Sequence, residues 1–366
     1  MKILFDYAIF FHQKLGGVSR YFLNLKKFIN INKKIEAKIF APFHTNKFLS
    51  NEKNSFSFNF YIDNYPKYSR RILNILNHNL SKVYCKFFRP NIIHKTFYNK
   101  DFNFDSNIKK VITVYDLIHE IYYNEYYQPK GYLPKKESLS NVDFIICPSV
   151  KTKSDLINYY NIKEEKIKVI YMGVHQFEKV EAINFNKDYS PFILYVGERK
   201  RYKNFLNLLK AISIKKNIYN DFKLICFGGG SLTKNEQEII ADLKIDVNKI
   251  IQVEGDDSDL YHYYKKATAF VFPSKYEGLG LPQLEAMSLG CPVISSNHEA
   301  IIESVGNAAA IFDPNKPEDI AETLNNYLYS SEKLNSLKSK GLARSKLFSL
   351  EKCALETVAV YKNLFN

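Results

Sequence analysis

Residues 269–287 read Ala-Phe-Val-Phe-Pro-Ser-Lys-Tyr-Glu-Gly-Leu-Gly-Leu-Pro-Gln-Leu-Glu-Ala-Met. The short apolar run Ala269–Phe272, bounded by polar residues, is typical of a buried strand. Gly278 and Gly280 follow as a turn, and Pro282 is favoured in the first turn of a helix, where its missing N–H would have no partner anyway. The stretch therefore predicts a strand, a turn and a helix, which is the repeating element of α/β proteins with parallel sheets.

The same alternation extends outward through the chain and predicts an α/β fold. In the N-terminal half, we expect strands at Ile3–Phe5, Ala37–Phe40, Ile92–His94, Val111–Tyr115, Phe144–Cys147 and Lys168–Tyr171, and helices at Val18–Ile29, Ser69–Phe87 and Lys151–Tyr160. In the C-terminal half, we expect strands at Phe192–Val196, Lys223–Phe227, Ile250–Val253, Ala269–Phe272, Pro292–Ile294 and Ala309–Phe312, and helices at Asn204–Ser213, Lys234–Leu243, Ser258–Lys266, Pro282–Leu289, Pro317–Tyr329, Glu332–Leu347 and Ser349–Phe365.

The length of 366 residues exceeds what one hydrophobic core usually supports. The stretch Gly173 to Ser190 is poor in pattern and is predicted to be a linker. We therefore expect two doubly wound, Rossmann-like domains, 1–180 and 190–348, and a final helix at 349–366. Two such domains face each other across a central cleft, where open α/β sheets bind ligands beyond the carboxyl ends of their strands.

Composition and charge narrow the class of protein. Hydrophobic residues make up 46% and charged residues 25% of the chain, as in ordinary globular proteins. The net charge of +14 lies in residues 1–100, which hold 18 Lys and Arg against 4 Asp and Glu, whereas residues 101–366 hold 34 of each. Such a region suits an anionic partner or membrane surface, or it reflects a Lys-rich surface without a specific role. No nucleic-acid motif accompanies it, so no nucleic-acid partner is expected.

The sequence also indicates where the protein works. No apolar run reaches the length that spans a bilayer, and the N-terminus lacks the pattern of a secretory signal. A cytoplasmic protein is therefore expected. No pair of cysteines has the spacing of a metal or redox site, and we expect no metal; the cysteines are Cys85, Cys147, Cys226, Cys291 and Cys353.

The turn in residues 273–287 has the features of an anion site. Its glycines let the backbone approach a ligand, and the free N–H groups and dipole of the following helix attract a diphosphate. Glu277 is placed to accept a hydrogen bond from a sugar hydroxyl, and Glu285 to accept from the two hydroxyls of a ribose. Alternatively, Glu285 only complements the helix dipole.

At this point the sequence resembles the retaining glycosyltransferases of family four, which have the GT-B fold. The resemblance covers nearly the whole chain and rests on the pair Glu277 and Glu285, with seven residues between them, and on the neighbouring runs at 290–294 and 303–306. It implies that Glu277 contacts the donor sugar, that Glu285 binds the nucleotide ribose, and that the diphosphate is held by backbone amides at Gly278, Leu279, Gly280 and Leu281.

A second match is the strand end and basic loop of residues 196–204 (Val-Gly-Glu-Arg-Lys-Arg-Tyr-Lys-Asn), which includes Gly197. In the family, an Arg and a Lys here neutralise the donor diphosphate, and Arg199 and Lys203 occupy those positions. Preorganised cations act most where charge develops in the transition state. Without the resemblance, a solvated run of charges would be the better explanation of the loop. Gly228 and Gly229 match a family loop near the nucleotide base.

The N-terminal half carries further matches. Gly16 and Gly17 resemble the family's first glycine loop, which lies under the donor phosphates. Tyr115 stands where many members have a histidine near the reacting carbon, next to an aspartate that is Asp116 here. This departure leaves the roles of Tyr115 and of His119 open between hydrogen bonding to the donor, acid–base or positioning work, and simple packing or exposure.

The helix expected at Ser69–Phe87 is amphipathic. Six apolar side chains fall on one face, and Lys and Arg lie elsewhere; the six are Ile72, Ile75, Leu76, Leu80, Val83 and Phe87. A basic amphipathic helix of this kind can lie on a membrane surface. The same pattern is typical of a helix packed on a sheet, and packing on the N-terminal sheet is the interpretation we favour.

Together with these features, the family resemblance implies a metal-independent, retaining glycosyltransferase without a cofactor. It would move a hexose, with mannose favoured, from a GDP- or UDP-linked donor to a saccharide or lipid-linked saccharide acceptor in surface-polysaccharide assembly (O-antigen, capsule or lipopolysaccharide). Peripheral contact of residues 1–100 with the inner face of the plasma membrane accompanies this interpretation. Two alternatives stay open: a nucleotide-sugar epimerase of the same fold, and a non-catalytic partner subunit.

Overall fold

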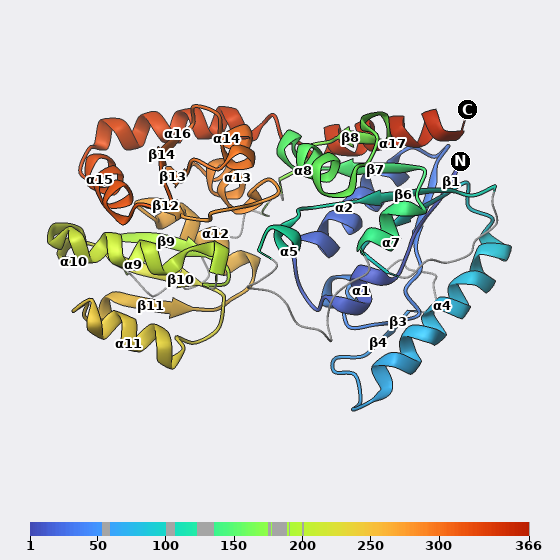
Figure 1. Ribbon diagram of the computed structural model, residues 1–366, viewed down its shortest axis with the longest axis horizontal. Helices are drawn as coiled ribbons and strands as arrows, with labels where there is room; N and C mark the ends of the chain where they lie inside the picture. The colour runs from blue at the N-terminus through green and yellow to red at the C-terminus, as the bar shows by residue number, and fades with distance from the viewer. Residues whose placement is uncertain are drawn as a thin grey trace. The chain divides into compact units, whose positions relative to one another are not determined.

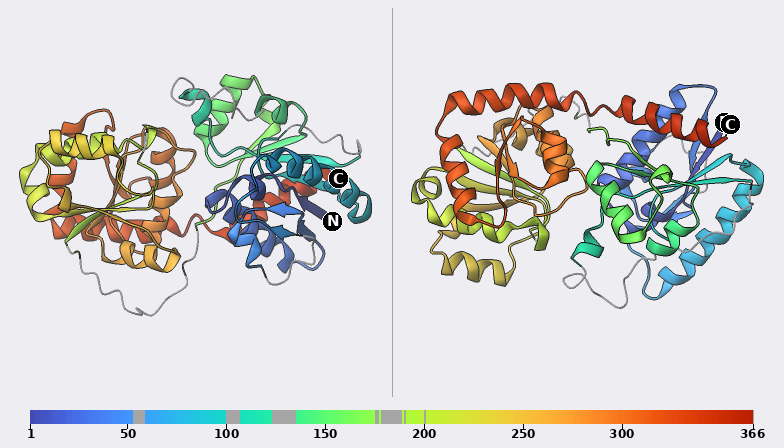
Figure 2. Two further views of the ribbon diagram at one scale, coloured as in Figure 1. Left: turned by 90° about the horizontal axis from the view of Figure 1, so that it is seen from below. Right: turned by 45° about the horizontal axis from the view of Figure 1, so that its top comes forward.

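A computed structural model describes residues 1–52, 59–99, 107–122, 135–174, 177, 189, 191–199 and 201–365. Most of the predicted linker at Gly173–Ser190 lies outside these residues. The chain forms two compact units: the first comprises Met1–Glu120, Tyr126–Gly173 and Leu350–Asn366, and the second comprises Ile121–Glu125 and Val174–Ser349. Each unit is an α/β domain built on a parallel sheet, so the predicted fold class is confirmed (Figures 1 and 2).

The first unit is built around a six-stranded parallel sheet with the order β2-β1-β5-β6-β7-β8. Its strands are β1 (Lys2–Phe5), β2 (Glu36–Ile39), β5 (Ile92–Lys95), β6 (Lys109–Thr113), β7 (Phe144–Cys147) and β8 (Ile167–Val169). A two-stranded parallel pair that the sequence pattern did not predict lies beside it, β3 (Phe43–His44) and β4 (Phe60–Tyr61). All four residues of β5 are buried, as expected for a central strand covered on both faces.

Helices cover both faces of this sheet (Figure 2). They are α1 (Ala8–His12), α2 (Gly17–Ile31), α3 (Lys47–Ser50), α4 (Ser69–Phe88), α5 (Ile118–Ile121), α7 (Lys135–Ser140), α8 (Val150–Tyr160) and α17 (Leu350–Phe365), with a 3-10 turn, η1, at Glu164–Lys166. The C-terminal helix α17 packs against α2. It is tied to the sheet by a buried hydrogen bond between Tyr361 and His94 of β5, and the other ring nitrogen of His94 bonds Thr113 at 2.8 Å.

The second unit repeats the architecture with the strand order β11-β10-β9-β12-β13-β14. Its strands are β9 (Phe192–Val196), β10 (Lys223–Phe227), β11 (Ile250–Val253), β12 (Ala269–Phe272), β13 (Val293–Ser296) and β14 (Ala309–Phe312). Its helices are α9 (Phe205–Ile214), α10 (Lys216–Asp221), α11 (Lys234–Asp242), α12 (Asp257–Lys266), α13 (Leu281–Ser288), α14 (Glu299–Val305), α15 (Pro317–Leu328) and α16 (Ser331–Ser345), with 3-10 turns η2 (Arg201–Lys203) and η3 (Val247–Lys249).

Most expected elements are present within one or two residues of their predicted bounds. The strands at 144–147, 192–196, 223–227, 250–253, 269–272 and 309–312 have the predicted bounds. The short helices α1, α10 and α14 were not predicted, since five to seven residues carry too little periodicity to be recognised.

The packing predicted for the helix at 69–87 is wrong. The six apolar side chains expected to lie against the sheet are all exposed on α4, from 41% for Leu76 to 79% for Phe87. The buried side of α4 instead carries Asn77, Ser81 and Cys85. The physical reason is that Asn77 pairs with the backbone of β3, donating to Phe43 O at 2.9 Å and accepting from Phe43 N at 2.8 Å. No described helix is long and apolar enough to cross a bilayer.

Candidate functional site

The motifs singled out in the C-terminal half meet at one edge of the second sheet. Strands β10, β9 and β12 are neighbours and run parallel, so their carboxyl ends lie together. Gly228 follows β10, Gly197 follows β9, and Pro273 follows β12. The loops are joined by backbone hydrogen bonds, from Gly197 N to Phe227 O at 2.9 Å and from Lys275 N to Tyr202 O at 2.7 Å.

Lys203 and Glu277 form an ion pair at this edge. The Nζ of Lys203 lies 2.6 Å from Oε1 of Glu277, and their side chains are only 19% and 11% exposed. The ammonium also lies 5.5 Å from the ring centre of Phe272. The pair therefore brings together one residue from each of the two family motifs, although 74 positions separate them in sequence.

The turn after Glu277 leaves backbone N–H groups open. Gly280 has φ of +85°, and a Cβ there would lie 2.6 Å from Nε2 of Gln283. Helix α13 then begins at Leu281 with no side-chain cap. The N–H groups of Leu279, Gly280 and Leu281 have no acceptor in the described part of the chain. Together with the helix dipole, they form a concentration of positive potential that suits an anion.

A buried amide holds this turn in place. Gln283 is fully buried; its Nε2 donates to Ser304 Oγ at 2.7 Å, and its Oε1 accepts from Ser295 Oγ at 2.7 Å. Each partner lies on a neighbouring element, Ser295 on β13 and Ser304 on α14. Gln283 was not predicted from the sequence, because a glutamine in a helix has no distinctive local pattern.

Glu285 is half-buried on α13, on the helix that starts at the open turn. Its carboxylate lies close enough to Tyr264 that, after burial, it is the largest contribution raising the pKa of that phenol. Tyr264 is fully buried and donates to Pro282 O at 3.1 Å, so α12 supports the first turn of α13. The predicted ribose contact of Glu285 stays a prediction.

Arg199 lies at the same edge but is bound to the protein. Its buried guanidinium donates to both carboxylate oxygens of Glu236, at 2.9 and 3.4 Å, and to three carbonyl oxygens of the glycine loop, Gly228, Gly230 and Ser231, at 2.8–3.2 Å. The predicted contact of Arg199 with a diphosphate stays a prediction. What the structure adds is a second task, holding residues 228–231 against the end of β9.

Glu236 is the partner that the sequence analysis missed. Burial alone would raise the pKa of this carboxyl group, but hydrogen bonds from Arg199 and from Thr233 outweigh burial and lower it. Thr233 and Glu236 form a capping box at the start of α11, with bonds of 2.7 and 3.2 Å. The pattern Thr-x-x-Glu was therefore a readable signal for the helix start, though not for the ion pair.

Gly229 is required where the two loops touch. It has φ of +79°, and a Cβ at this position would lie 2.7 Å from Gly197 O and 3.1 Å from Nη1 of Arg199. Only glycine can satisfy both conditions without displacing backbone atoms. The close approach of Gly197 O therefore explains the glycine at position 229.

The predicted residues of the first unit lie at the start of α2, between β6 and α5, and on α5. Gly16 precedes α2, and a Cβ there would collide with the side chain of Gln13, whereas a Cβ on Gly17 would meet nothing within 4 Å. Gln13 caps the helix by accepting from Ser19 N at 3.0 Å. The backbone at Gly17 is therefore open, which is compatible with the predicted phosphate contact but does not test it.

Tyr115, Asp116 and His119 occupy different environments. Tyr115 is only 8% exposed, and its hydroxyl has no hydrogen-bond partner in the described part of the chain. Burial raises its pKa, so the phenol stays neutral and can donate a hydrogen bond. The carboxylate of Asp116 accepts from Ile118 N at 3.1 Å at the start of α5, and His119 is exposed on α5.

Asp6 at the end of β1 was not recognised as a candidate. Burial raises its pKa, against hydrogen bonds from Thr96 N at 2.9 Å and from the hydroxyl of Thr96. A charged residue inside the otherwise apolar stretch 3–11 was the available signal. These bonds join the ends of β1 and β5, which indicates a structural role.

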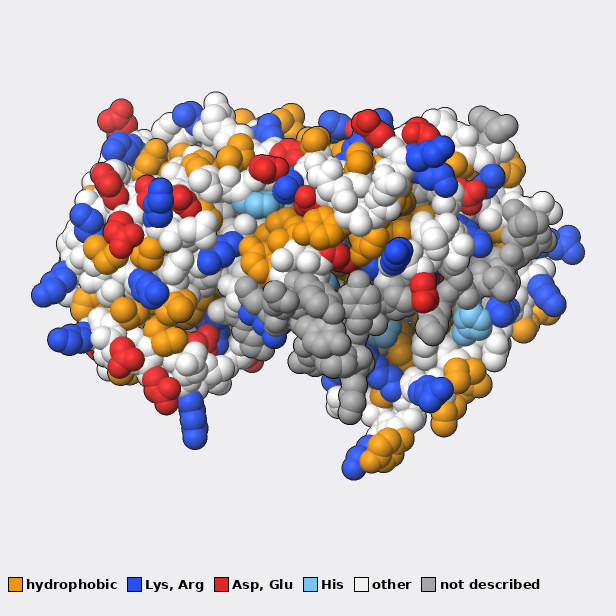
Figure 3. All heavy atoms as spheres, viewed as in Figure 1, with side chains coloured by type: hydrophobic (Ala, Val, Ile, Leu, Met, Phe, Trp, Pro, Cys, Tyr) orange, Lys and Arg blue, Asp and Glu red, His pale blue; other side chains and the backbone are white. Residues whose placement is uncertain are grey.

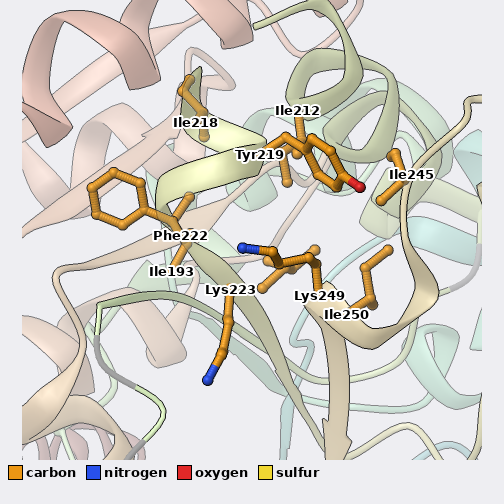
Figure 4. A pocket seen from close by; sticks show the side chains of 10 residues that line it. Ile193, Ile212, Ile218, Tyr219, Phe222, Lys223, Ile245, Lys249 and Ile250 are labelled. Atoms are coloured by element: carbon orange, nitrogen blue, oxygen red, sulfur yellow. The ribbon is translucent and has the colours of Figure 1, made fainter. Parts of the chain in front are cut away.

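A pocket elsewhere in the second unit is not part of this edge. It lies among the amino-terminal parts of β9, β10 and β11, the helices α9 and α10, and the segment between α11 and β11 (Figure 4). Its lining is apolar except for Lys223 and Lys249, and the ammonium of Lys249 donates to Asn220 O at 2.7 Å. None of the motifs predicted from the sequence lies there.

The chain is similar to known proteins over most of its length. Residues 15–176 match the family model "Glycosyltransferase Family 4", and residues 176–344 match "Glycosyl transferases group 1". The chain is 28% identical over 286 residues to "O-antigen chain mannosyltransferase B" of Escherichia coli, covering 73% of the chain and 74% of that protein. It is 27% identical over 254 residues to "O-antigen chain mannosyltransferase RfbU" of Salmonella typhimurium, covering 65% and 70%.

Among solved structures, sucrose-phosphate synthase from Thermosynechococcus elongatus superposes with a TM-score of 0.77 at 19% identity, covering 100% of this chain and 98% of that one. At this sequence identity, the similarity is evidence for the fold alone. The fold is GT-B, as the sequence analysis predicted.

Proposed function

Since the chain belongs to the glycosyltransferases of family 4 and group 1, we propose that it transfers mannose, or a similar hexose, from a nucleotide-sugar donor. The acceptor is a saccharide or lipid-linked saccharide of a growing surface polysaccharide. The substrate assignment is supported by the two O-antigen chain mannosyltransferases that match most of its length. The donor is GDP- or UDP-linked.

The observation that carries the proposal is the Lys203–Glu277 pair beside the open turn. The N–H groups of Leu279, Gly280 and Leu281 and the ammonium of Lys203 converge on one edge of the sheet. A diphosphate bound there takes the ammonium as its counter-ion. Glu277 is then released to accept a hydrogen bond from a hydroxyl of the transferred sugar, and Glu285 accepts from the ribose.

In the proposed reaction, the bond between the anomeric carbon and the diphosphate oxygen breaks while a new bond forms to the acceptor oxygen. Attack from the face that the leaving group vacates retains the anomeric configuration. The acceptor proton passes to a diphosphate oxygen, so that charge is balanced without an external base. Lys203 and the helix dipole stabilise the negative charge that develops on the diphosphate, and this supply of positive charge supports a reaction that does not require a divalent cation.

Binding is tested by thermal shift with GDP, UDP, dTDP and ADP, in EDTA and then with Mg²⁺. At about 100 times its dissociation constant, a ligand adds about 2.7 kcal/mol of stability. We expect one nucleoside diphosphate to stabilise the wild type in EDTA. Its affinity for Glu285→Ala should be at least about tenfold lower. Glu318→Ala is the matched control, because Glu318 is an exposed glutamate in the first turn of α15. Equal binding by Glu285→Ala would refute the ribose contact.

Catalysis is tested with the selected nucleotide sugar and a saccharide acceptor, and the anomeric configuration of the product is read by NMR. Retention is expected, with kcat reduced at least about 100-fold in Lys203→Met. Inversion of configuration would overturn the mechanism. Conversion of the donor without an acceptor would instead identify an epimerase, and failure to bind any nucleotide would favour a non-catalytic subunit.

A further inference from the structure

Helix α4 presents an apolar face that nothing in the described part of the chain covers. The exposed fractions are 62% for Ile72, 52% for Ile75, 41% for Leu76, 41% for Leu80, 51% for Val83 and 79% for Phe87. At about 100° per residue, these six side chains occupy an arc of about 140° along the whole helix. Large apolar surfaces of this kind mark interaction sites on soluble proteins.

The orientation of α4 is held by its opposite side. Asn77 is fully buried and both donates to and accepts from the backbone of Phe43. Tyr84 stacks on Phe40 with ring centres 4.1 Å apart, and Phe88 is buried in a cluster with Leu4. Rolling the apolar face inward would break these bonds and leave the Asn77 amide unpaired, which is costly. The exposed face is therefore built into the fold.

The charge around this face has one sign. Between Asp63 and Asp101 the sequence contains eight Lys and Arg residues and no Asp or Glu, and four of the eight lie on α4. By helical position, Lys86 falls within the apolar arc, and Arg71 and Lys82 follow one of its edges. Figure 3 shows hydrophobic side chains interleaved with those of Lys and Arg along the lower right edge, where Figure 1 places α4.

We propose that the exposed face of α4 docks on an anionic lipid surface, lying parallel to it with the apolar side chains in the interface. The basic side chains keep their charged ends at the level of the lipid phosphates, while their aliphatic stems cover apolar surface. Charge complementarity decides this occupant over a second copy of the chain. Two α4 faces brought together would oppose like charges with no acidic residue from positions 64–100 to compensate.

The experiment measures co-sedimentation of the full chain with vesicles of phosphatidylcholine alone or mixed with phosphatidylglycerol, without any nucleotide sugar. We expect binding to the mixed vesicles that weakens as salt is added. The variant Ile72→Gln, Val83→Gln, Phe87→Gln removes apolar side chains while retaining a good helix former. Its affinity should fall at least about tenfold. Arg71→Gln, Lys82→Gln, Lys86→Gln should also weaken binding and flatten its salt dependence.

A matched control places the same three glutamines on other helices, at Ile302, Leu342 and Leu355, which are 43%, 38% and 64% exposed. This variant should bind the vesicles as the wild type does. The proposal is overturned if the wild type does not bind the mixed vesicles, or if the α4 variant and the control bind equally. It is also overturned if sedimentation velocity shows that the wild type and the control are dimers and the α4 variant is a monomer, since the face is then a self-interface.

The outcome is independent of the proposed function. Melting temperatures and the nucleotide-induced thermal shift of the α4 variant should match those of the wild type, because the substituted side chains are exposed and belong to the first unit. Loss of vesicle binding with an intact nucleotide shift isolates the membrane contact. Intact vesicle binding without any nucleotide shift would instead count against the transferase assignment alone.

Discussion

Replacing Glu236 by glutamine removes one charge from a buried ion pair while keeping the shape of the side chain. The guanidinium of Arg199 is 2% exposed and lies 2.9 Å from Glu236, whose side chain is 15% exposed. Removing one partner of a buried pair costs about 3–5 kcal/mol, because the remaining charge is left uncompensated. Three carbonyl oxygens still accept from Arg199, and the glutamine oxygen can accept one bond and cap α11. We therefore expect a loss of about 2 kcal/mol.

The assay is thermal unfolding of the full chain, monitored by calorimetry. Calorimetry separates the transitions of the two units if they unfold independently. For a unit of about 175 residues, 2 kcal/mol corresponds to a fall in melting temperature of about 4–8 °C. Glu236→Ala, which also deletes the cap, should lose about 3–4 kcal/mol. Glu238→Gln on the exposed side of α11 is the control and should change stability by less than about 0.5 kcal/mol.

A fall of less than about 0.5 kcal/mol for Glu236→Gln would refute the reasoning. It would mean that Arg199 does not depend on this carboxylate, and that the guanidinium is free to neutralise a ligand. The predicted diphosphate contact of Arg199 would then gain support at the expense of the structural role. Nucleotide binding measured on the same variant distinguishes the two roles. If Arg199 is structural, Glu236→Gln loosens residues 228–231 and weakens binding, whereas binding does not weaken if the guanidinium neutralises the diphosphate.

Three further results are expected. The folded-state pKa of Glu236 is lowered, so its contribution to the free energy of unfolding is complete above the unfolded pKa of about 4.3 and is lost as pH falls through the folded pKa. In calorimetry, the wild type should therefore lose its greater stability relative to Glu236→Gln below about pH 4. Gly280→Ala should cost at least about 1–2 kcal/mol, because φ is +85° there and the new Cβ would meet Gln283, whereas Gly17→Ala should be nearly neutral in the same melting assay. Asn77→Leu should cost about 2–3 kcal/mol in chemical denaturation, because the N–H and C=O of Phe43 lose their buried partner; an unchanged midpoint would show that α4 is not held by this residue.

The sequence was informative about the second unit because its pattern is local. The apolar run, the paired glycines and Pro282 each act within a few residues, so the strand, turn and helix at 269–288 could be predicted with their bounds. The parallel pairing of β9, β10 and β12 then follows from general rules of α/β topology, which bring the carboxyl ends of neighbouring strands together. It was thus predictable that Lys203 and Glu277 lie at the same edge of the sheet, though not that they form a hydrogen-bonded pair.

Partner choice among charged side chains was not predictable. Arg199 lies in a loop with several basic residues, and nothing near it in sequence indicates Glu236, which belongs to a helix that starts after the next strand. The selection depends on which loop carbonyls lie within reach once β9 and β10 are paired. Such contacts are set by tertiary packing, because their free energies depend on burial and geometry rather than on spacing.

Helix α4 shows which features the sequence determines and which the tertiary structure determines. Its existence, its length and its division into an apolar and a polar side followed from the period of 3.6 residues, which is a property of the backbone. The side turned inward did not follow, because periodicity gives the direction of a face only relative to the helix itself. That choice was made by Asn77 meeting the backbone of β3, a contact between segments 34 residues apart that exists only once the sheet and its neighbouring strands are assembled.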